Sequence, residues 1–384
     1  MQQRLGFPNA SIKLFQNYDA WLENKFLELG GTFITLTMRD NIRGINEGLL
    51  QILDNKNLHT LLTGDEIIQV SVSNANTSIV LNRLYGIKNS AVSVDEKGDN
   101  IITFGLGHLH QNKRLKFARK FFPNATDSIN TMIDVLYNDK PRMKPNVNGI
   151  NIRVPDVAWM DTYDTYLDFS REFGLGIDND TFAFIWEDIR GINMIDYYSM
   201  INQEPLQYQV GEPSTIGEFS QFMEIPVAYD FTWLTKANSY DRNPHDDITY
   251  YSYSMTDKGI NTIIKGNGNN SVMIPRFGSY EDMLYRNGFE ESNRISIMSQ
   301  YDCYSKFTTV GDFNIVPSNK MQFLDPKGQF VSYFYVDEVV HEVSAEQSFT
   351  HVYMFSNSKK VDDENNIRVK NEINTERTEE TDNY

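Results

Sequence analysis

The feature that most constrains the fold is a period-two alternation of apolar and polar residues near both ends of the chain. It occurs in GGTFITLTMRD (residues 30–40) and DEIIQVSVSNA (65–75), and again in FVSYFYVDEVVHEVSAEQSFTHVYMF (330–355). Successive side chains of a β-strand point to opposite faces, so this alternation is typical of strands with one covered face. Both ends of the chain are therefore predicted to form β-structure.

The middle of the chain has a mixed character. Apolar residues with helical spacing predict helices around residues 129–136, 163–173 and 280–288, and a further helix over EESNRISIMSQYDCYSKF (290–307). DNDTFAFIWEDIRGINMIDY (178–197) instead predicts an apolar strand followed by its hairpin partner. The fold class expected is α+β and mainly β.

An internal echo relates the two ends. GDEIIQV…NRLYGIKNSAVSV…GDNIITFGL (64–106) resembles GDFNIVP…SYFYVDEVVHEVS…SFTHVYMF (311–355). The echo aligns Tyr85 with Tyr335, Ser93 with Ser344, and Ile101 with Phe349 or Thr350. It predicts two related antiparallel β-barrel domains, with a mixed α/β domain inserted between and into them.

This organisation predicts four parts of the chain. Residues 1–111 form the first barrel, and residues 112–206 with 240–306 form the mixed domain. Residues 207–239 with 307–360 form the second barrel, and residues 361–384 form an acidic C-terminal tail.

Charge and composition exclude several functional classes. The 384 residues are 40% hydrophobic and 23% charged, as in an ordinary globular protein. The net charge of −17 argues against a general nucleic-acid binder, because phosphate affinity needs clustered Lys and Arg. One cysteine cannot form an intramolecular disulfide. Neither a signal peptide nor a membrane-length apolar run is visible, so we expect assembly in a cytoplasm and no stable membrane association.

The strongest candidates for chemistry are His341 and His351, ten residues apart across a predicted turn. They could face each other on adjacent strands as a metal site or an acid–base site, or they could simply belong to a barrel wall. Glu342 must point to the face opposite His341, and two histidines do not complete a zinc site. The barrel wall is the preferred interpretation, and no catalytic, metal or cofactor site is predicted.

Other candidates are weaker. Glu187 and Asp188 are expected to be surface carboxylates, and Cys303 a small packed residue within the predicted helix. A basic run and three apolar residues of the tail are candidate partner contacts: Lys113, Arg114, Lys116, Arg119 and Lys120, with Ile367, Val369 and Ile373.

Several segments in order along the chain carry a family resemblance. They include GFPNASIKLFQNYDAW, LTMRDNIRGINEGLLQ, RKFFPNATDSI, INQEPLQYQVGEPSTIGEF, AYDFTWLTK, SQYDCYSKFTTVGDFNIVP and FYVDEVVHEVS…THVYMF. From about residue 5 to about residue 370, the chain resembles the central baseplate hub proteins of T-even-type contractile-tailed phages. This tail-hub family is related to the hub part of type VI secretion spikes.

The resemblance implies a non-enzymatic structural protein of the virion tail baseplate, without a cofactor. It implies a homotrimeric hollow cylinder that joins a sixfold tail tube to a threefold cell-puncturing spike. The implied partners are a lysozyme-bearing spike protein, tail tube and baseplate proteins, and the tape-measure protein. DNA would be only a transient passenger through an axial channel, during viral genome ejection.

Two alternatives stay open at this point. A receptor- or glycan-binding tail protein could line a sugar site with Trp159, Trp186 or Trp233, unless those side chains are buried in domain cores. A hydrolase with an unrecognised site would need activity of the isolated chain that depends on His341.

Overall fold

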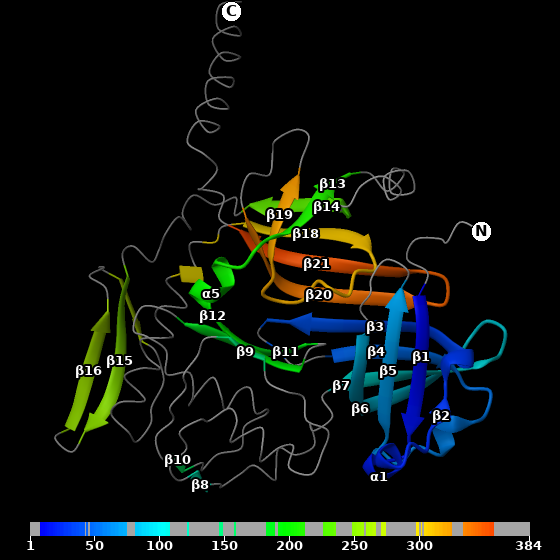
Figure 1. Ribbon diagram of the computed structural model, residues 1–384. Helices are drawn as coiled ribbons and strands as arrows, with labels where there is room; N and C mark the ends of the chain where they lie inside the picture. Colours follow the sequence, from blue (N-terminus) through cyan, green and yellow to red (C-terminus); the bar gives the residue numbers. More distant parts are fainter. Residues whose placement is uncertain are drawn as a thin grey trace, which may run out of the picture.

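The computed structural model describes residues 8–42, 44, 47–74, 81–107, 121–122, 146–148, 157–158, 182–188, 191–211, 226–235, 248–256, 259–265, 270–273, 297–298, 301, 303–324 and 333–356. These residues are mainly β, which confirms the predicted fold class (Figure 1). Most of their strands join one 13-stranded sheet, which curls into two barrel-like units.

The first unit comes from the N-terminal quarter of the chain. Its strands and short helices are β1 (Pro8–Phe15), α1 (Tyr18–Leu22), β2 (Leu27–Glu28), η1 (Gly30–Thr32), β3 (Phe33–Asn41), β4 (Glu47–Leu53), η2 (Leu58–Thr60), β5 (Ile67–Asn74), β6 (Leu81–Val94) and β7 (Asn100–Gly107). β1 and β5 cross the direction of β3 and β4, so the sheet wraps around a core (Figure 1). Alternate strand residues fill that core, among them Ile12, Leu36, Ile68 and Phe104.

The second unit is a closed six-stranded barrel. It consists of β13 (Leu206–Val210), β14 (Val227–Thr235), β18 (Cys303–Val310), β19 (Lys320–Leu324), β20 (Phe334–Ser344) and β21 (Ser348–Ser356). The order β19-β13-β14-β18-β21-β20 returns to β19 through a β19–β20 pairing. Aromatic rings dominate its core, where Phe307, Phe323 and Phe334 pack edge to face or tilted against their neighbours.

The two units repeat one topology. In the first, the spatial order is β3-β4-β7-β6-β5-β1, and in the second it is β14-β18-β21-β20-β19-β13. Chain order matches strand by strand, because β4 to β7 correspond to β18 to β21. One difference is that β1 pairs with β5 antiparallel, whereas β13 pairs with β19 parallel. The internal echo of the sequence therefore reflects two related barrels.

β-Bulges fix the correspondence between the repeats. The ladder of β6 and β7 shifts at Lys88, and the ladder of β20 and β21 shifts at Asp337. Counting from these bulges aligns Ser93 with Glu342, whereas the sequence echo aligned it with Ser344. It likewise aligns Tyr85 with Phe334 rather than Tyr335, and Ile101 with Phe349, as one option of the echo predicted. Residue identity misplaced the register by one or two positions because it did not include the bulges.

A single strand joins the two units. β20 pairs with β19 near its start, at Phe334 and Tyr335, and with β3 of the first unit from Glu338 to Ser344. Val339 lies in the core of the second unit, and Val343 lies in the core of the first. The two barrels thus share one sheet and partly share one strand.

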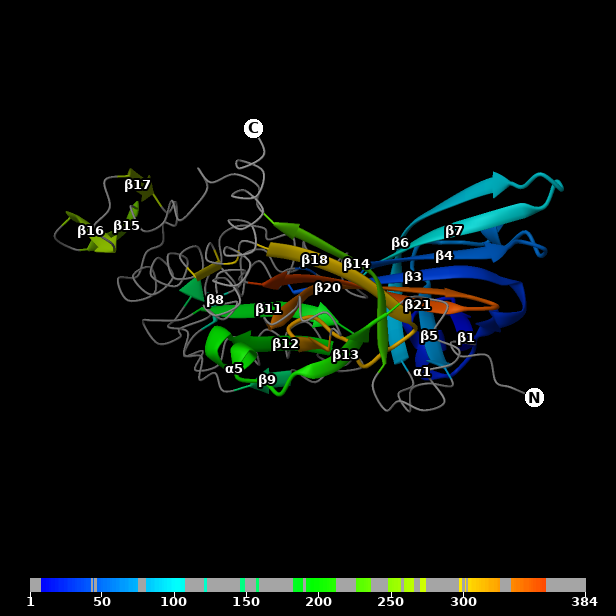
Figure 2. The same ribbon diagram turned by 90° about the horizontal axis from the view of Figure 1, so that it is seen from above.

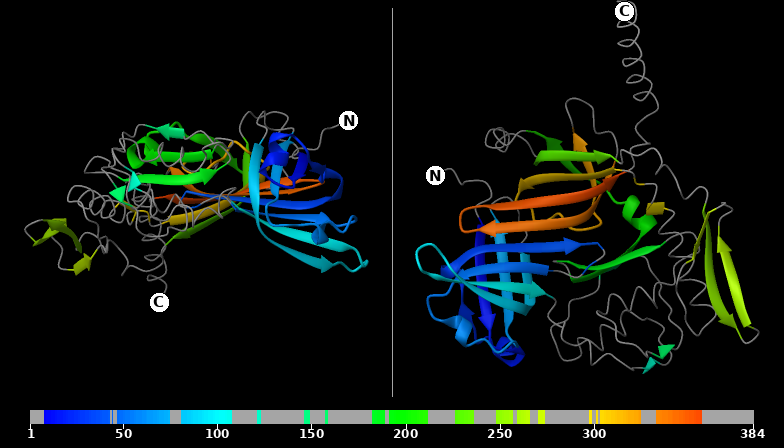
Figure 3. Two further views of the ribbon diagram at one scale, coloured as in Figure 1. Left: turned by 90° about the horizontal axis from the view of Figure 1, so that it is seen from below. Right: turned by 180° about the vertical axis from the view of Figure 1, so that it is seen from behind.

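The remaining described strands lie beside the barrels. They are β8 (Phe121–Phe122), β9 (Asn146–Asn148), β10 (Val157–Ala158), β11 (Ala183–Asp188), β12 (Gly191–Asp196), β15 (Ile248–Thr256), β16 (Gly259–Lys265) and β17 (Asn270–Met273), with helix α5 (Tyr197–Ile201). β15 and β16 stand apart from both barrels in the views of Figures 1 and 3. The β11–β12 hairpin confirms the prediction for residues 178–197.

A third core connects β11, β12 and α5 to the barrels. Trp186 and Phe184 of β11 pack with Tyr335 and Phe355 of the second barrel. The predicted helices around residues 129–136, 163–173 and 280–288 lie outside the described residues.

The predicted helix over residues 290–307 is wrong in its second half. Residues 297 and 298 are helical, but β18 begins at Cys303 and alternates buried and exposed side chains. Cys303 is therefore a buried strand residue. Hydrogen bonding to β14 and β21 on both sides holds this segment extended.

Candidate assembly surface

Eight neighbouring strands of the large sheet form a continuous surface that we call the wall. Their order is β14-β18-β21-β20-β3-β4-β7-β6, and the pairing of β20 with β3 lies at its centre. One face of the wall covers the two barrel cores. The other face points away from the cores, and we call it the outer face.

Two ion pairs of opposite charge lie on the outer face, and Lys306 Nζ lies there over the ring of Tyr353, 5.9 Å from its centre. Arg39 Nη2 donates to Glu338 Oε2 at 2.7 Å across the joint between the barrels, and Lys88 Nζ donates to Glu47 Oε1 at 2.6 Å. The hydrogen bond and charge of Glu338 raise the pKa of Arg39, against a smaller opposing effect of burial. These two pairs neutralise part of the charge on the outer face.

Neutral hydrogen bonds continue across the wall. Thr35 Oγ1 donates to Gln51 Oε1 at 3.1 Å, and Gln51 Nε2 donates to Thr103 Oγ1 at 3.3 Å. The three residues lie on β3, β4 and β7, so one row of polar side chains crosses three strands. Such cross-strand pairs stabilise a sheet modestly and leave a hydroxyl- and amide-rich surface.

The structure separates the two histidines that the sequence offered as a pair. His341 pairs with Thr350 and His351 pairs with Val340, so the two rings lie on opposite faces of the β20–β21 hairpin. His351 Nε2 lies 3.3 Å from Glu342 Oε2 on the outer face. The possibility that the histidines face each other is wrong, because adjacent register positions alternate in direction. The predicted barrel-wall placement and the opposed direction of Glu342 are confirmed.

His341 is a core residue at the boundary of the two barrels. Its side chain is fully buried, its Nδ1 lies 3.0 Å from Thr350 Oγ1, and its ring meets Phe313 edge to face. Burial, together with the positive charge of Arg83, lowers the pKa of His341 to about 3. The ring is therefore neutral at ordinary pH, and its geometry is that of a packed, hydrogen-bonded histidine.

A buried ion pair lies at one end of the first barrel. Arg83 Nη1 of β6 donates to Asp40 Oδ1 of β3 at 2.6 Å, and both side chains are almost completely buried. The guanidinium lies 5.3 Å from the ring centre of Tyr85. Burial acts to lower the pKa of Arg83, but the charges of Asp40, Tyr85 and Glu187, together with the hydrogen bond to Asp40, outweigh burial and hold the pKa above its usual value. The sequence gives no spacing signal for this pair, because its members are 43 residues apart.

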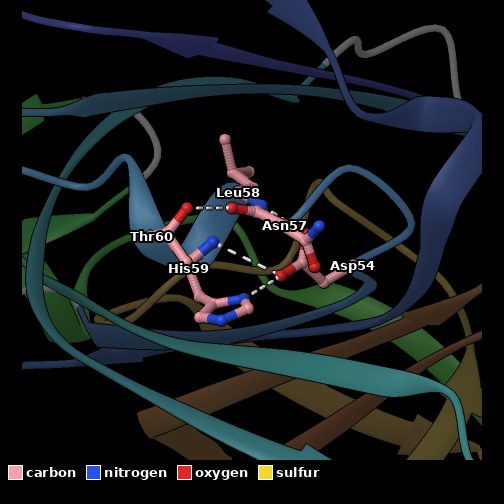
Figure 4. A network of polar contacts seen from close by, with 5 residues as sticks. All are labelled: Asp54, Asn57, Leu58, His59 and Thr60. Carbon is pink, nitrogen blue, oxygen red and sulfur yellow. Dashed lines mark hydrogen bonds and ion pairs between the residues drawn. The ribbon is translucent and has the colours of Figure 1, made fainter.

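A second polar network organises the loop between β4 and β5 (Figure 4). Asp54 accepts hydrogen bonds from the backbone N–H groups of Leu58, at 2.6 Å, and His59, at 3.3 Å, and it also contacts His59 Nδ1. Burial acts to raise the pKa of Asp54, but these hydrogen bonds outweigh it and the pKa lies below its usual value. The network holds η2 in place, as a side-chain cap does for a helix start.

The carboxylates expected at the surface are buried. Glu187 and Asp188 of β11 are about 1% and 0% exposed, and Asp188 Oδ2 accepts a hydrogen bond from Trp186 Nε1 at 2.9 Å. The prediction of surface carboxylates is wrong here because β11 packs into the third core. Trp186 is itself buried there, which counts against a sugar site built on it. Trp159 lies outside the described residues, and Trp233 belongs to β14.

All eight candidate contact residues lie outside the described residues, namely Lys113, Arg114, Lys116, Arg119, Lys120, Ile367, Val369 and Ile373. Within the described ranges, no three or more His, Cys, Asp or Glu side chains are grouped to hold a metal ion. The same residues include no helix that is both long and apolar enough to cross a membrane.

Comparison with solved structures gives the same fold in two bacterial tail proteins. The tail protein from Neisseria meningitidis MC58 superposes with a TM-score of 0.56 and 7% identity, over 91% of this chain and 96% of its own. The 43 kDa tail protein of prophage MuSo2 from Shewanella oneidensis gives 0.54 and 9% identity, over 90% of this chain and 98% of its own. No curated protein matches the chain in sequence.

Two family models cover almost all of the sequence. The baseplate structural protein domain 1 model matches residues 3–197, and the domain 2 model matches residues 200–372. A mainly β chain with two related barrels and these matches is a structural protein of a phage-type tail baseplate. The chain belongs to the baseplate structural protein family, and it contains both of that family's domains.

Proposed function

We propose that the chain is the central hub of a contractile-tail baseplate. Three copies would form a hollow cylinder on the tail axis, between a sixfold tail tube and a threefold spike. The protein would act through its geometry and not as an enzyme. It would match the sixfold symmetry of the tube to the threefold symmetry of the spike, retain the spike until release and keep an axial channel open.

The observation that carries this proposal is the repeated six-stranded unit. One chain contains two units with the same strand order, and they lie side by side in one sheet. Three chains with two units each present six similar units around an axis. A closed ring of this kind can offer six similar surfaces to a tube and three identical surfaces to a spike.

The proposed partners follow from the family and from this symmetry. They are a lysozyme-bearing spike protein on the threefold side, tube and baseplate proteins on the sixfold side, and the tape-measure protein in the channel. The basic run at residues 113–120 and the apolar residues of the tail are proposed contact points. Virion location and assembly in a host cytoplasm are part of the same proposal.

The acidity of the chain suits a conduit. With 52 acidic and 35 basic residues, the protein would repel DNA rather than hold it, because phosphate binding depends on clustered cations. The ion pair of Arg39 with Glu338 lowers the positive charge that the outer face could offer to phosphate groups. DNA would then be only a transient passenger.

The domain division is also a proposal. Residues 1–111 would be the first barrel, 112–206 with 240–306 the mixed domain, 207–239 with 307–360 the second barrel, and 361–384 the tail. β1 to β7 fall within the first of these segments, which supports that boundary, and β19 to β21 fall within the third. β18 (Cys303–Val310) belongs to the second barrel and extends four residues across the proposed boundary between residues 306 and 307.

Co-expression with the spike protein of the same genome tests the proposal. Light scattering after size-exclusion chromatography should give the mass of three chains plus three spike chains. A stable one-to-one complex, or no complex with any spike or tube protein, would contradict the hub function. We also expect that neither the chain alone nor its His341→Ala variant cleaves peptidoglycan.

A further inference from the structure

The joint between the two barrels contains buried polar side chains on both sides of the β20–β3 pairing. β20 and β3 run side by side in the views of Figures 1 and 2. Asp40 and His341 are diagonal neighbours on this ladder, because the residue opposite His341 is Met38. Both side chains are buried, and Asp40 forms the ion pair with Arg83 of β6. Polar groups of three strands therefore meet inside the joint.

Three of these side chains have buried polar atoms that no protein group satisfies. The atoms are Nε and Nη2 of Arg83, Oη of Tyr85 and Nε2 of His341, and no described residue is placed to form a hydrogen bond with any of them. Arg83 is 1% exposed, and Tyr85 and His341 are 0% exposed, so bulk water does not reach these atoms either. We call the three side chains the joint cluster.

The members of the joint cluster lie close to one another. Arg83 and Tyr85 are two residues apart on β6, so they point to the same side of that strand. The guanidinium carbon of Arg83 lies 5.3 Å from the ring centre of Tyr85. Burial lowers the pKa of His341, and the charge of Arg83 lowers it further from across the joint. The unsatisfied atoms of β6 and β20 therefore share one region of the interior.

Buried polar atoms of this kind are almost always hydrogen-bonded in native proteins, either to protein groups or to ordered water. Each of them has lost its contacts with bulk water, so several of them left dry in one place would oppose folding. The joint cluster therefore requires an occupant that is small and polar and that the protein encloses.

The charges around the joint cluster favour a neutral occupant. Arg83 carries one positive charge, and the carboxylate of Asp40 already balances it at 2.6 Å. Burial raises the pKa of Tyr85, and the negative charge of Glu187 raises it further, which places a second carboxyl group nearby. An anion would add to this negative charge, and a cation would face the guanidinium. Neither kind of ion suits the site.

The hydrogen-bonding character of the unsatisfied atoms fits water. The nitrogen atoms of Arg83 only donate, whereas the Tyr85 hydroxyl can donate and accept. The Thr350 hydroxyl lies 3.0 Å from His341 Nδ1 and 3.4 Å from the carbonyl oxygen of Asp312. The shorter contact favours donation to the ring, which places the ring proton on Nε2. A water molecule can accept from the guanidinium and from this ring while it donates to the Tyr85 oxygen.

We propose that Arg83, Tyr85 and His341 bind one or more ordered water molecules, which bridge the first barrel to the shared strand β20. A buried water typically makes about three hydrogen bonds to otherwise unsatisfied groups, and the joint cluster supplies three such side chains. Through Nδ1 of His341, the bridge continues to Thr350 of β21 in the second barrel. Because all these residues lie in one chain, the site forms whether or not the chain acts as a hub.

Tyr85→Phe tests the site through the direction of its effect on stability. If the hydroxyl binds water, its removal deletes a hydrogen bond and should raise the unfolding equilibrium constant of the full chain about fivefold, measured by urea denaturation. If the hydroxyl is buried dry, its removal relieves a cost, so an unchanged or lower constant would overturn the proposal. The matched control is Tyr198→Phe, at 47% exposure, which should leave the constant unchanged.

A double-mutant cycle tests whether the two strands share the water. His341→Asn keeps a polar group near the position of Nδ1, beside Thr350, and removes the one at Nε2. Tyr85 Oη and His341 Nε2 form no direct hydrogen bond, so coupling between Tyr85→Phe and His341→Asn reports the water that joins them. The double variant should have an unfolding constant at least about threefold lower than the two single effects multiplied together. Effects that multiply exactly as independent changes would contradict the bridge.

Crystals of the unaltered full chain at high resolution give the direct observation and do not depend on any variant. A density peak within hydrogen-bond distance of Arg83 Nη2, and of Tyr85 Oη or His341 Nε2, would establish the water site. Crystals grown in sodium bromide distinguish water from a halide ion, because bromide scatters anomalously. An anomalous peak at the joint cluster, or a map with no peak beside these atoms, would overturn the proposal.

Discussion

At the scale of single residues, the strongest constraint on the first barrel is the buried pair of Arg83 and Asp40. Replacing Asp40 by Ala removes the hydrogen-bonded counter-charge of a buried guanidinium, which costs about 3–5 kcal/mol of unfolding free energy. Urea denaturation followed by fluorescence measures the change. The exposed pair Lys88–Glu47 is the matched control, and Glu47→Ala should cost at most about 1 kcal/mol.

If Asp40→Ala and Glu47→Ala lower the free energy of unfolding by the same amount, the buried pair stabilises the first barrel no more than the exposed pair does. The double variant Arg83→Met with Asp40→Leu removes both charges together. It should recover much of the loss, because neither member of the pair is then buried without the other.

Asp54 should make stability depend on pH in the acidic range. Its folded pKa lies below the usual value of 3.8, so its stabilising effect is complete above that value and is lost as pH falls through the folded pKa. Asp54→Asn should therefore cost about 1 kcal/mol at pH 7, and the difference from the parent should shrink below about pH 4. Thermal unfolding from pH 7 to pH 3 measures it.

The control for this prediction is Asp65→Asn, an exposed aspartate of the same loop. It should follow the parent curve at each pH. A constant gap between Asp54→Asn and the parent down to pH 3 would mean that the charge of Asp54 contributes nothing.

At this scale the sequence predicted little of the site. Arg83 and Asp40 are distant in sequence, and a strand pattern alone does not show that a charged residue faces inward. The histidines were correctly assigned to a strand pair, but their faces depended on a register that only the structure supplies. Asp54 had a weak local signal, since an aspartate before a short turn is a common cap.

At the scale of elements, β20 couples the two barrels, because its two halves belong to different cores. Val343→Ala removes two methyl groups from a packed site and should cost about 1–3 kcal/mol. Amide exchange should become faster in β3 as well as in β21, since both pair with this half of β20.

The equivalent change Val94→Ala is the matched control at the same place in the repeat. Its side chain is 64% exposed in the single chain, so the monomer should lose less than about 0.5 kcal/mol. Equal losses for the two variants in the monomer would contradict the correspondence between β6 and β20.

Strands with a strong alternation of apolar and polar residues could be predicted from the sequence. The point at which a helical spacing of apolar residues changes to a strand spacing could not. The β11–β12 hairpin and the terminal strands followed from their apolar patterns. β18 was misassigned because Ile295, Met298 and Tyr301 have helical spacing and the following alternation begins only at Cys303. Two neighbouring strands decide its conformation, and local sequence does not contain them.

At the scale of the whole molecule, the proposed hub function depends on one relation: two like units per chain and three chains per ring. The sequence suggested the repeat, but the shared sheet and the joint through β20 required the structure. The measurement that tests this most directly is cryo-electron microscopy of the chain with its spike, viewed along the axis. We expect a threefold ring with six similar lobes around an open centre. A closed centre, or lobes that do not number two per chain, would contradict it.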